Sequence, residues 1–254
     1  MSIVFFVDEV GARVIENTRH QLQDYTIVYD PKRYENPTWI PTGCVRTIPH
    51  PLKNERQSFL KELGTPQLGV ICSYSRILWK ELIDLFPMGV VNIHGGKLPE
   101  YRGASTLQWA IINGEDSTAA TLHFVDEGVD TGPVIDSAEV VIETHDSALI
   151  VLGKILNASA LLLDIWLPSL LQGKVSAYPQ DESKAHVWPR CTPEDGLIDW
   201  AQSDEEISLL TRALAAPWSG AFYYTNDNKK VVIDYALSPP EVAKLRKEAG
   251  RAAW

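Results

Sequence analysis

The first half of the chain alternates short apolar runs with amphipathic segments, and this alternation limits the possible folds more than any other feature. The strand candidates are SIVFFVD, YTIVYD, QLGVICSY and GVVNIHGG, which have the length and the β-branched content of buried strands. Helices are expected near residues 11–22 and in NERQSFLKEL and LWKELIDLF. Because strands that alternate with helices form mostly parallel sheets, we expect an α/β, Rossmann-like fold with helices on both faces of the sheet.

The pattern changes after a long apolar helix that ends near Gly173. Before that helix we expect a helix in ASTLQWAIING and strands in AATLHFVDE and PVIDSAEVVIE, and a loop over residues 31–51. Beyond Gly173 the chain is proline-rich and irregular, and GAFYYTNDNKKVVIDYA predicts a β-hairpin that turns near Asn226. We therefore predict a large domain of residues 1–173 and a small, mixed C-terminal domain of residues 174–254.

Composition narrows the class of protein. The formal charge of −10 argues against general attraction to nucleic acid, because such affinity depends on lysine and arginine neutralising phosphates. Cys44, Cys72 and Cys191 are odd in number and far apart, which favours a reducing, cytoplasmic location over a disulfide framework. The start MSIVFFVDEVGAR has no basic flank, so it is typical of a strand and not of a signal peptide.

The segment of residues 148–173 is the most apolar part of the chain. A membrane span there would carry the charges of Lys154 and Asp164. We expect a buried helix of a globular domain and no membrane partner.

Four sequence signatures are absent: those of dinucleotide-binding folds, P-loop enzymes, serine hydrolases and zinc proteases.

Polar side chains gather where one apolar strand ends. Asn92 and His94 are two residues apart, so they point to the same face of the strand, and Gly95 and Gly96 follow them. Asp130 lies in the glycine-containing loop FVDEGVDTGPVI between two further strands. If those strands flank the Asn-x-His strand, an amide, an imidazole and a carboxylate meet at one edge of the sheet.

This set of groups suits acyl transfer to an amine. An imidazole is the usual proton acceptor near neutral pH, an asparagine amide can stabilise an oxyanion, and a carboxylate can orient the histidine. Asn92 and His94 could instead hydrogen-bond a turn, and Asp130 could belong to an Asx turn. A metal site at His123, Asp126, Glu127 and Asp130 is disfavoured because the spacing matches no calcium loop, and we expect no metal.

Four motifs resemble a known family. NIHGGKLPEYRGASTLQWAIINGE and ATLHFVDEGVDTGPVI resemble the core of the formyltransferases that use 10-formyltetrahydrofolate. RCTPEDGLIDW and RALAAPWSGAF resemble stretches shared by the tRNA and sugar branches of that family. The similarity runs from about residue 69 to residue 222, and it implies that residues 1–173 form the formyltransferase catalytic domain.

The resemblance implies a catalytic trio of Asn92, His94 and Asp130. His94 would be the general base, Asn92 the oxyanion donor and Asp130 the partner of the histidine and of the folate side. The folate co-substrate, 10-formyltetrahydrofolate, would bind against the four residues Ile77, Leu78, Val125 and Asp126.

The chain departs from the family pattern after His94, where it has Gly95-Gly96-Lys97-Leu98-Pro99. Lys97 and Arg102 could contact an anionic substrate; alternatively, Lys97 is a solvated loop lysine and Arg102 is paired with a nearby carboxylate. Trp218 could stack on the nucleobase of the substrate, or pack a hairpin against the main domain.

The resemblance fits the sugar N-formyltransferases best. These enzymes are implied to formylate a nucleotide-linked amino-deoxysugar in bacterial surface polysaccharide biosynthesis, including the O-antigen of lipopolysaccharide, and to form cytoplasmic homodimers. A methionyl-tRNA formyltransferase-like enzyme is the first alternative, and a short acidic chain disfavours it because tRNA is a polyanion. A non-catalytic relative is the second alternative, and retention of the whole trio disfavours it.

Overall fold

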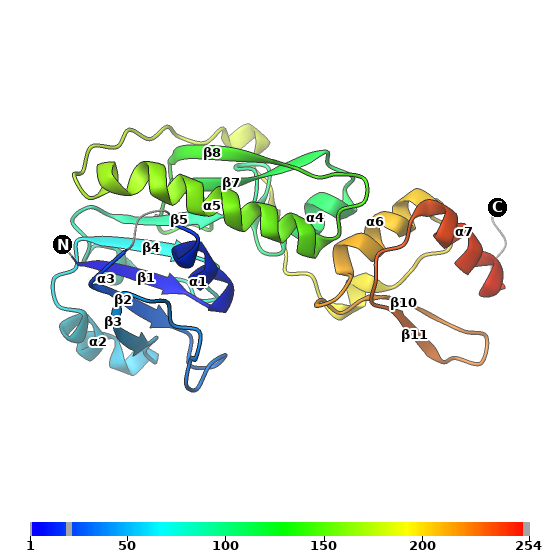
Figure 1. The fold of residues 1–254 in the computed structure, drawn as a ribbon, viewed down its shortest axis with the longest axis horizontal. Helices are drawn as coiled ribbons and strands as arrows, with labels where there is room; N and C mark the ends of the chain where they lie inside the picture. Colours follow the sequence, from blue (N-terminus) through cyan, green and yellow to red (C-terminus); the bar gives the residue numbers. More distant parts are fainter. Residues whose placement is uncertain (1, 19–21, 251–254) are drawn as a thin grey trace. The chain divides into compact units, whose positions relative to one another are not determined.

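The main element of the protein is a seven-stranded sheet in the order β3-β2-β1-β4-β5-β7-β8 (Figure 1). The structure is a computed structural model that describes residues 2–18 and 22–250. The pairs from β3 through β5 are parallel, and β5 pairs with β7 in the antiparallel sense. The sheet strands are β1 (Ile3–Val7), β2 (Tyr25–Tyr29), β3 (Cys44–Pro49), β4 (Leu68–Cys72), β5 (Val90–His94), β7 (Ser117–Phe124) and β8 (Val134–Val141).

Helices cover both faces of the sheet, as the sequence predicts. Val4 and Phe6 of β1 point into an apolar cluster with residues of α2 and α3, whereas α1 packs on the opposite face, where Gly11 lies against Val7. This division follows from the alternation of side chains along a strand. The longer helices are α1 (Glu9–Glu16), α2 (Arg56–Leu63), α3 (Lys80–Ile83), α4 (Thr106–Ile112), α5 (Ala148–Leu170), α6 (Asp204–Leu214) and α7 (Pro239–Glu248).

Short elements complete the chain. The predicted C-terminal hairpin is confirmed: β10 and β11 pair in the antiparallel sense, and the Thr225 N–H donates to the Lys229 carbonyl. The remaining elements are β6 (Arg102–Gly103), β9 (Val187–Trp188), β10 (Ala221–Tyr224), β11 (Lys230–Ile233) and the 3-10 turns Lys53–Glu55, Glu182–Lys184 and Pro193–Gly196.

Three details of the predicted secondary structure are wrong. The helix expected in LWKELIDLF is limited to Lys80–Ile83. The loop expected over residues 31–51 contains β3, an edge strand in which only Ile48 is buried, so its apolar signal is weak. The first helix begins at Glu9 because the Asp8 carboxylate accepts the N–H groups of Val10 and Gly11, and it ends at Glu16. Part of the predicted range, residues 19–21, lies outside the described residues.

Contacts divide the chain into two compact units. The first comprises Met1–Arg102, Ala119–Ala138 and Leu156–Ala185, and the second comprises Gly103–Thr118, Glu139–Ile155 and His186–Trp254. The chain therefore passes between the units several times. This division by contacts does not test the domain boundary at Gly173, which stays a prediction.

Helix α5 has the length and the composition of a membrane span, with a mean hydropathy of 1.9 and 44% of its most apolar window buried. The core helix of a globular protein meets the same criteria, so this feature is weak evidence for a membrane. Leu162 and Leu163 are almost fully buried, and the Trp166 indole donates to the Asp136 carboxylate of β8 over 2.7 Å. These contacts anchor the helix to the sheet.

We expect Leu163→Ala to lower the free energy of unfolding by about 2–5 kcal/mol, because it leaves a cavity under α5. Leu161→Ala is the matched control: Leu161 is 46% exposed, so its truncation should change stability by less than about 0.5 kcal/mol. Urea unfolding of the purified variants measures both values. Equal effects would show that α5 does not bury this face in solution.

Candidate active site

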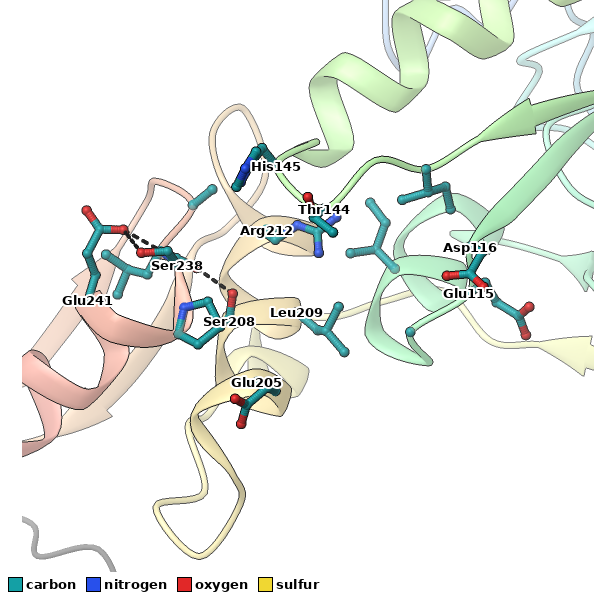
Figure 2. A pocket seen from close by; sticks show the side chains of 16 residues that line it. Glu115, Asp116, Thr144, His145, Glu205, Ser208, Leu209, Arg212, Ser238 and Glu241 are labelled. Atoms are coloured by element: carbon teal, nitrogen blue, oxygen red, sulfur yellow. Dashed lines mark hydrogen bonds between the residues drawn. The ribbon is translucent and has the colours of Figure 1, made fainter.

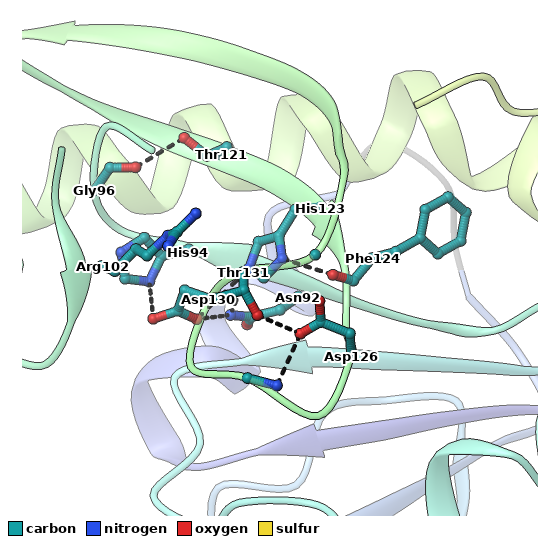
Figure 3. A network of polar contacts seen from close by, with 12 residues as sticks. Asn92, His94, Gly96, Arg102, Thr121, His123, Phe124, Asp126, Asp130 and Thr131 are labelled. Carbon is teal, nitrogen blue, oxygen red and sulfur yellow. Dashed lines mark hydrogen bonds and ion pairs between the residues drawn. The ribbon is translucent and has the colours of Figure 1, made fainter. Parts of the chain in front are cut away.

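The predicted trio comes together at the end of β5 (Figure 3). The Asn92 Nδ2 donates to Asp130 Oδ1 over 3.3 Å, and His94 Nδ1 lies 3.6 Å from Asp130 Oδ2. Asn92 and His94 project from the same face of the strand, and Asp130 reaches them from the loop between β7 and β8. An amide, an imidazole and a carboxylate from two distant segments thus share one site, while their catalytic roles stay predictions.

The orientation of the His94 ring assigns a separate task to each nitrogen. Nε2 lies 2.6 Å from the Tyr101 carbonyl oxygen, which can only accept, so Nε2 carries the proton. In the neutral ring, Nδ1 then holds the lone pair that faces Asp130. Burial lowers the pKa of His94 below its ordinary value of 6.5, against the opposing effect of Asp130. The ring is therefore a neutral base at physiological pH.

His123 is a member of this site that the sequence reasoning missed, having placed it only in a disfavoured metal set. Its ring is buried, and Nδ1 donates to the Phe124 carbonyl over 2.8 Å. Nε2 must then accept, and it lies 3.2 Å from the Asn92 Nδ2. His123 enters the site through the strand register, in which β5 and β7 place Asn92 opposite His123, and the sequence alone does not give this register.

The loop that carries Asp130 is closed by local contacts. Asp130 itself has a left-handed backbone with φ of 55°, and a Cβ on Gly132 would lie 1.8 Å from the Phe124 carbonyl oxygen. The Asp126 carboxylate accepts the Gly128 N–H and the Thr131 hydroxyl. Asp126 therefore shapes the loop, whether or not it also contacts a substrate.

The four residues predicted for folate binding differ in their surroundings. Leu78 is buried in an apolar cluster against which Val125 packs, whereas the Ile77 side chain is 79% exposed. The segment before Ile77 is anchored by Arg76, whose guanidinium binds both oxygens of the Asp30 carboxylate at 2.6 and 2.8 Å. This ion pair, with further hydrogen bonds, holds the pKa of Asp30 far below its usual value despite burial. Contact of a folate with Ile77, Leu78, Val125 and Asp126 stays a prediction.

The three residues predicted to contact the substrate also differ in their surroundings. Lys97 is exposed, and its side chain forms no ion pair among the residues that the structure describes. Arg102 is buried, and its guanidinium donates two hydrogen bonds each to Gln180 and Glu182, which favours the alternative that it is paired with a carboxylate. Trp218 belongs to the second unit, where its indole nitrogen lies 2.7 Å from the Gln108 side-chain amide.

A cavity of about 530 Å³ lies entirely within the second unit (Figure 2). It is lined by the end of α4, by α6 and by the segment before α7, and it contains none of the trio. Arg212 on its wall donates to the backbone carbonyls of Asp146 and Glu143. Within residues 2–18 and 22–250, no cluster of three or more potential metal ligands is found.

Two family models match the chain. The formyl transferase model matches residues 46–162, and the model of the formyl transferase C-terminal domain matches residues 190–251. Together these spans cover more than two thirds of the chain and include the whole trio. The protein belongs to the formyltransferase family and is a formyltransferase enzyme.

Solved structures share this fold. A 4-N formyltransferase from Francisella tularensis superposes with a TM-score of 0.76 at 18% identity, covering 93% of this chain and 98% of its own. A sugar N-formyltransferase from Shewanella sp. gives 0.73 at 19% identity, with coverages of 94% and 98%. An N-formyltransferase from Helicobacter canadensis, solved with folinic acid and dTDP-3-aminofucose, gives 0.67 at 18% identity, with coverages of 84% and 79%.

We expect Gly96→Ala to lower kcat by roughly tenfold to a hundredfold, as is typical when a catalytic group is displaced by about 1 Å. An added Cβ would lie 2.7 Å from both His94 Nε2 and the Tyr101 carbonyl oxygen, so one partner of this hydrogen bond must move. Gly153→Ala is the control, because an added Cβ there meets nothing within 4 Å. An unchanged kcat for Gly96→Ala in steady-state kinetics would contradict a role of the hydrogen bond between His94 and Tyr101 in positioning the ring.

We expect the His94 imidazole to titrate with a midpoint below 6.5 in the free protein, because burial disfavours its charged form. The neutral base is then present at pH 7 and is lost as the pH falls through the lowered pKa. Nitrogen-15 NMR of histidine-labelled protein, with His94→Ala to assign the signal, gives the midpoint. A midpoint above 6.5 would mean that the Asp130 charge outweighs burial.

Proposed function

We propose that the protein transfers the formyl group of 10-formyltetrahydrofolate to the amino group of a nucleotide-linked amino-deoxysugar. The observation that carries this proposal is the approach of the Asp130 carboxylate to the unprotonated nitrogen of a buried, neutral His94 beside the Asn92 amide. Membership of the formyltransferase family supplies the reaction class. The folinic acid and the dTDP-3-aminofucose in the Helicobacter canadensis relative support the donor and the acceptor.

In the proposed reaction, the neutral amine of the sugar attacks the formyl carbon and a new C–N bond forms. His94 Nδ1 takes the proton from the nitrogen, and Asp130 stabilises the resulting imidazolium. An N–H of Asn92 turns from its present partners, Asp130 and His123, to the developing oxyanion. The bond from the formyl carbon to N10 then breaks, and the proton passes to N10 of the departing tetrahydrofolate. This route needs neither a metal nor a covalent enzyme intermediate.

Further assignments belong to the same proposal. Ile77, Leu78, Val125 and Asp126 line the folate side, and Lys97 contacts the nucleotide sugar. Residues 1–173 form the catalytic domain and residues 174–254 the small domain. The enzyme acts as a cytoplasmic homodimer in the biosynthesis of a bacterial surface polysaccharide such as the O-antigen of lipopolysaccharide.

The test is to incubate the protein with 10-formyltetrahydrofolate and a panel of nucleotide-linked amino-sugars that differ in nucleotide and amine position. We expect one acceptor to gain the mass of a CO unit by mass spectrometry, because N–H becomes N–CHO. Charged initiator methionyl-tRNA is included in the panel. Formylation of the tRNA alone would replace the sugar acceptor by the tRNA acceptor, and formylation of nothing would defeat both.

We expect His94→Ala to lower kcat by roughly 10²–10⁴-fold with little change in KM, because a general base acts in the transition state. His145→Ala, an exposed histidine of the second unit, is the matched control and should keep the kinetics of the parent. Loss of activity on treatment with a chelator, or a trapped formyl-enzyme, would contradict the proposed route.

A further inference from the structure

Gln180 makes an unusually complete set of contacts beside the trio. It lies in the irregular segment after α5, within the first unit. Its Nε2 donates to the carbonyl oxygens of Asp130 and Gly132 at 2.7 and 2.8 Å. Its Oε1 accepts from Nε and Nη2 of Arg102 at 3.0 and 2.9 Å. The side chain thus uses two donors and two acceptor positions.

The chemistry of these contacts requires a carboxamide. Two carbonyl oxygens need donors, and a guanidinium needs an acceptor, on opposite ends of one planar group. A glutamate at position 180 would have no N–H for the carbonyls of Asp130 and Gly132, and a lysine would have no oxygen for Arg102. The residue type is therefore dictated by both ends of the contact.

One end of Gln180 holds the loop that presents the carboxylate. Asp130 has a positive φ of 55°, a conformation that residues with a side chain rarely adopt. The two hydrogen bonds from Gln180 fix the carbonyls of Asp130 and Gly132, on either side of Thr131. They therefore stabilise the backbone from which the Asp130 carboxylate reaches His94.

The other end of Gln180 binds Arg102, which follows the residue whose carbonyl accepts the hydrogen bond of the His94 ring. Arg102 directly follows Tyr101, whose carbonyl accepts the His94 Nε2–H. The Arg102 side chain is only 4% exposed, and its charge is met by the Glu182 carboxylate at 2.6 Å. Gln180 and Glu182 thus anchor Arg102 and, through the peptide bond, the Tyr101 carbonyl.

We infer that Gln180, acting with Arg102, is a positioning residue that sets the distance between Asp130 and His94. Gln180 and Arg102 connect the loop that carries Asp130 with the segment whose Tyr101 carbonyl holds His94. Neither residue touches the reacting atoms in the proposed scheme. The inference rests on the proposed function only for its kinetic consequence, because the position of His94 can be measured without a substrate.

The experiment compares Gln180→Met, which keeps the length of the side chain but removes all four hydrogen bonds, with the parent protein. We expect kcat to fall roughly tenfold to a hundredfold, with KM for both substrates changed less than about threefold. We also expect the pKa of His94, followed by nitrogen-15 NMR of the free protein, to fall further. The sign follows because the Asp130 charge raises that pKa and would move away.

Gln172→Met, an exposed glutamine of the same connecting segment, is the matched control and should behave as the parent. An unchanged kcat, or a reduced kcat with His94 titrating as in the parent, would overturn the inference. If Gln180→Met fails to fold, Gln180→Glu takes its place, since it keeps the acceptor for Arg102. If neither variant folds, Gln180 is a residue of the fold and the inference is wrong.

The two proposals fail in different ways. A parent protein that formylates no acceptor would defeat the proposed function, while the His94 titration would still report on Gln180. A parent that formylates an acceptor, with a Gln180→Met variant that is equally active, would leave the proposed function standing and remove the positioning role.

Discussion

The antiparallel pairing of β5 with β7 is the constraint on which the site depends. Its register places Asn92 opposite His123 and His94 opposite Thr121, with Ile93 opposite Leu122 between them. A slip of one residue would turn the polar side chains of β5 to the other face of the sheet. The same pairing starts the loop that returns Asp130 to the end of β5. Main-chain hydrogen bonds of the sheet therefore bring together groups from segments that are far apart in the sequence.

In the proposed reaction, His94 is a base that is neutral before it takes a proton and is stabilised by its neighbours afterwards. Burial opposes a charge on His94, so the resting ring keeps the lone pair on Nδ1. Once the ring takes a proton, Nδ1–H faces the Asp130 carboxylate and Nε2–H keeps the Tyr101 carbonyl. The charged form thus finds both of its partners in place, and little reorganisation is needed at that step.

The sequence predicts those parts of this arrangement that depend on local pattern. The alternation of strands and helices predicts the parallel sheet, and the spacing of Asn92 and His94 predicts their shared face. What it misses depends on long-range contacts. Strand β3 has one buried residue, so pairing rather than periodicity defines it. His123 enters the site through the strand register, and Gln180 lies in a segment whose residues carry no periodic signal.

From the sequence, Arg102 is a candidate for contact with an anionic substrate, but the structure pairs it with a carboxylate of the protein instead. Its guanidinium is buried, and Glu182 already supplies the opposite charge, so an incoming anion would have to displace a bidentate carboxylate. Lys97, three residues after His94, is exposed instead. For a chain with a net charge of −10, attraction of the proposed nucleotide sugar, which is anionic, would depend on such local cations rather than on the electric field of the whole protein. The fold thus pairs the arginine with a carboxylate and leaves the lysine exposed.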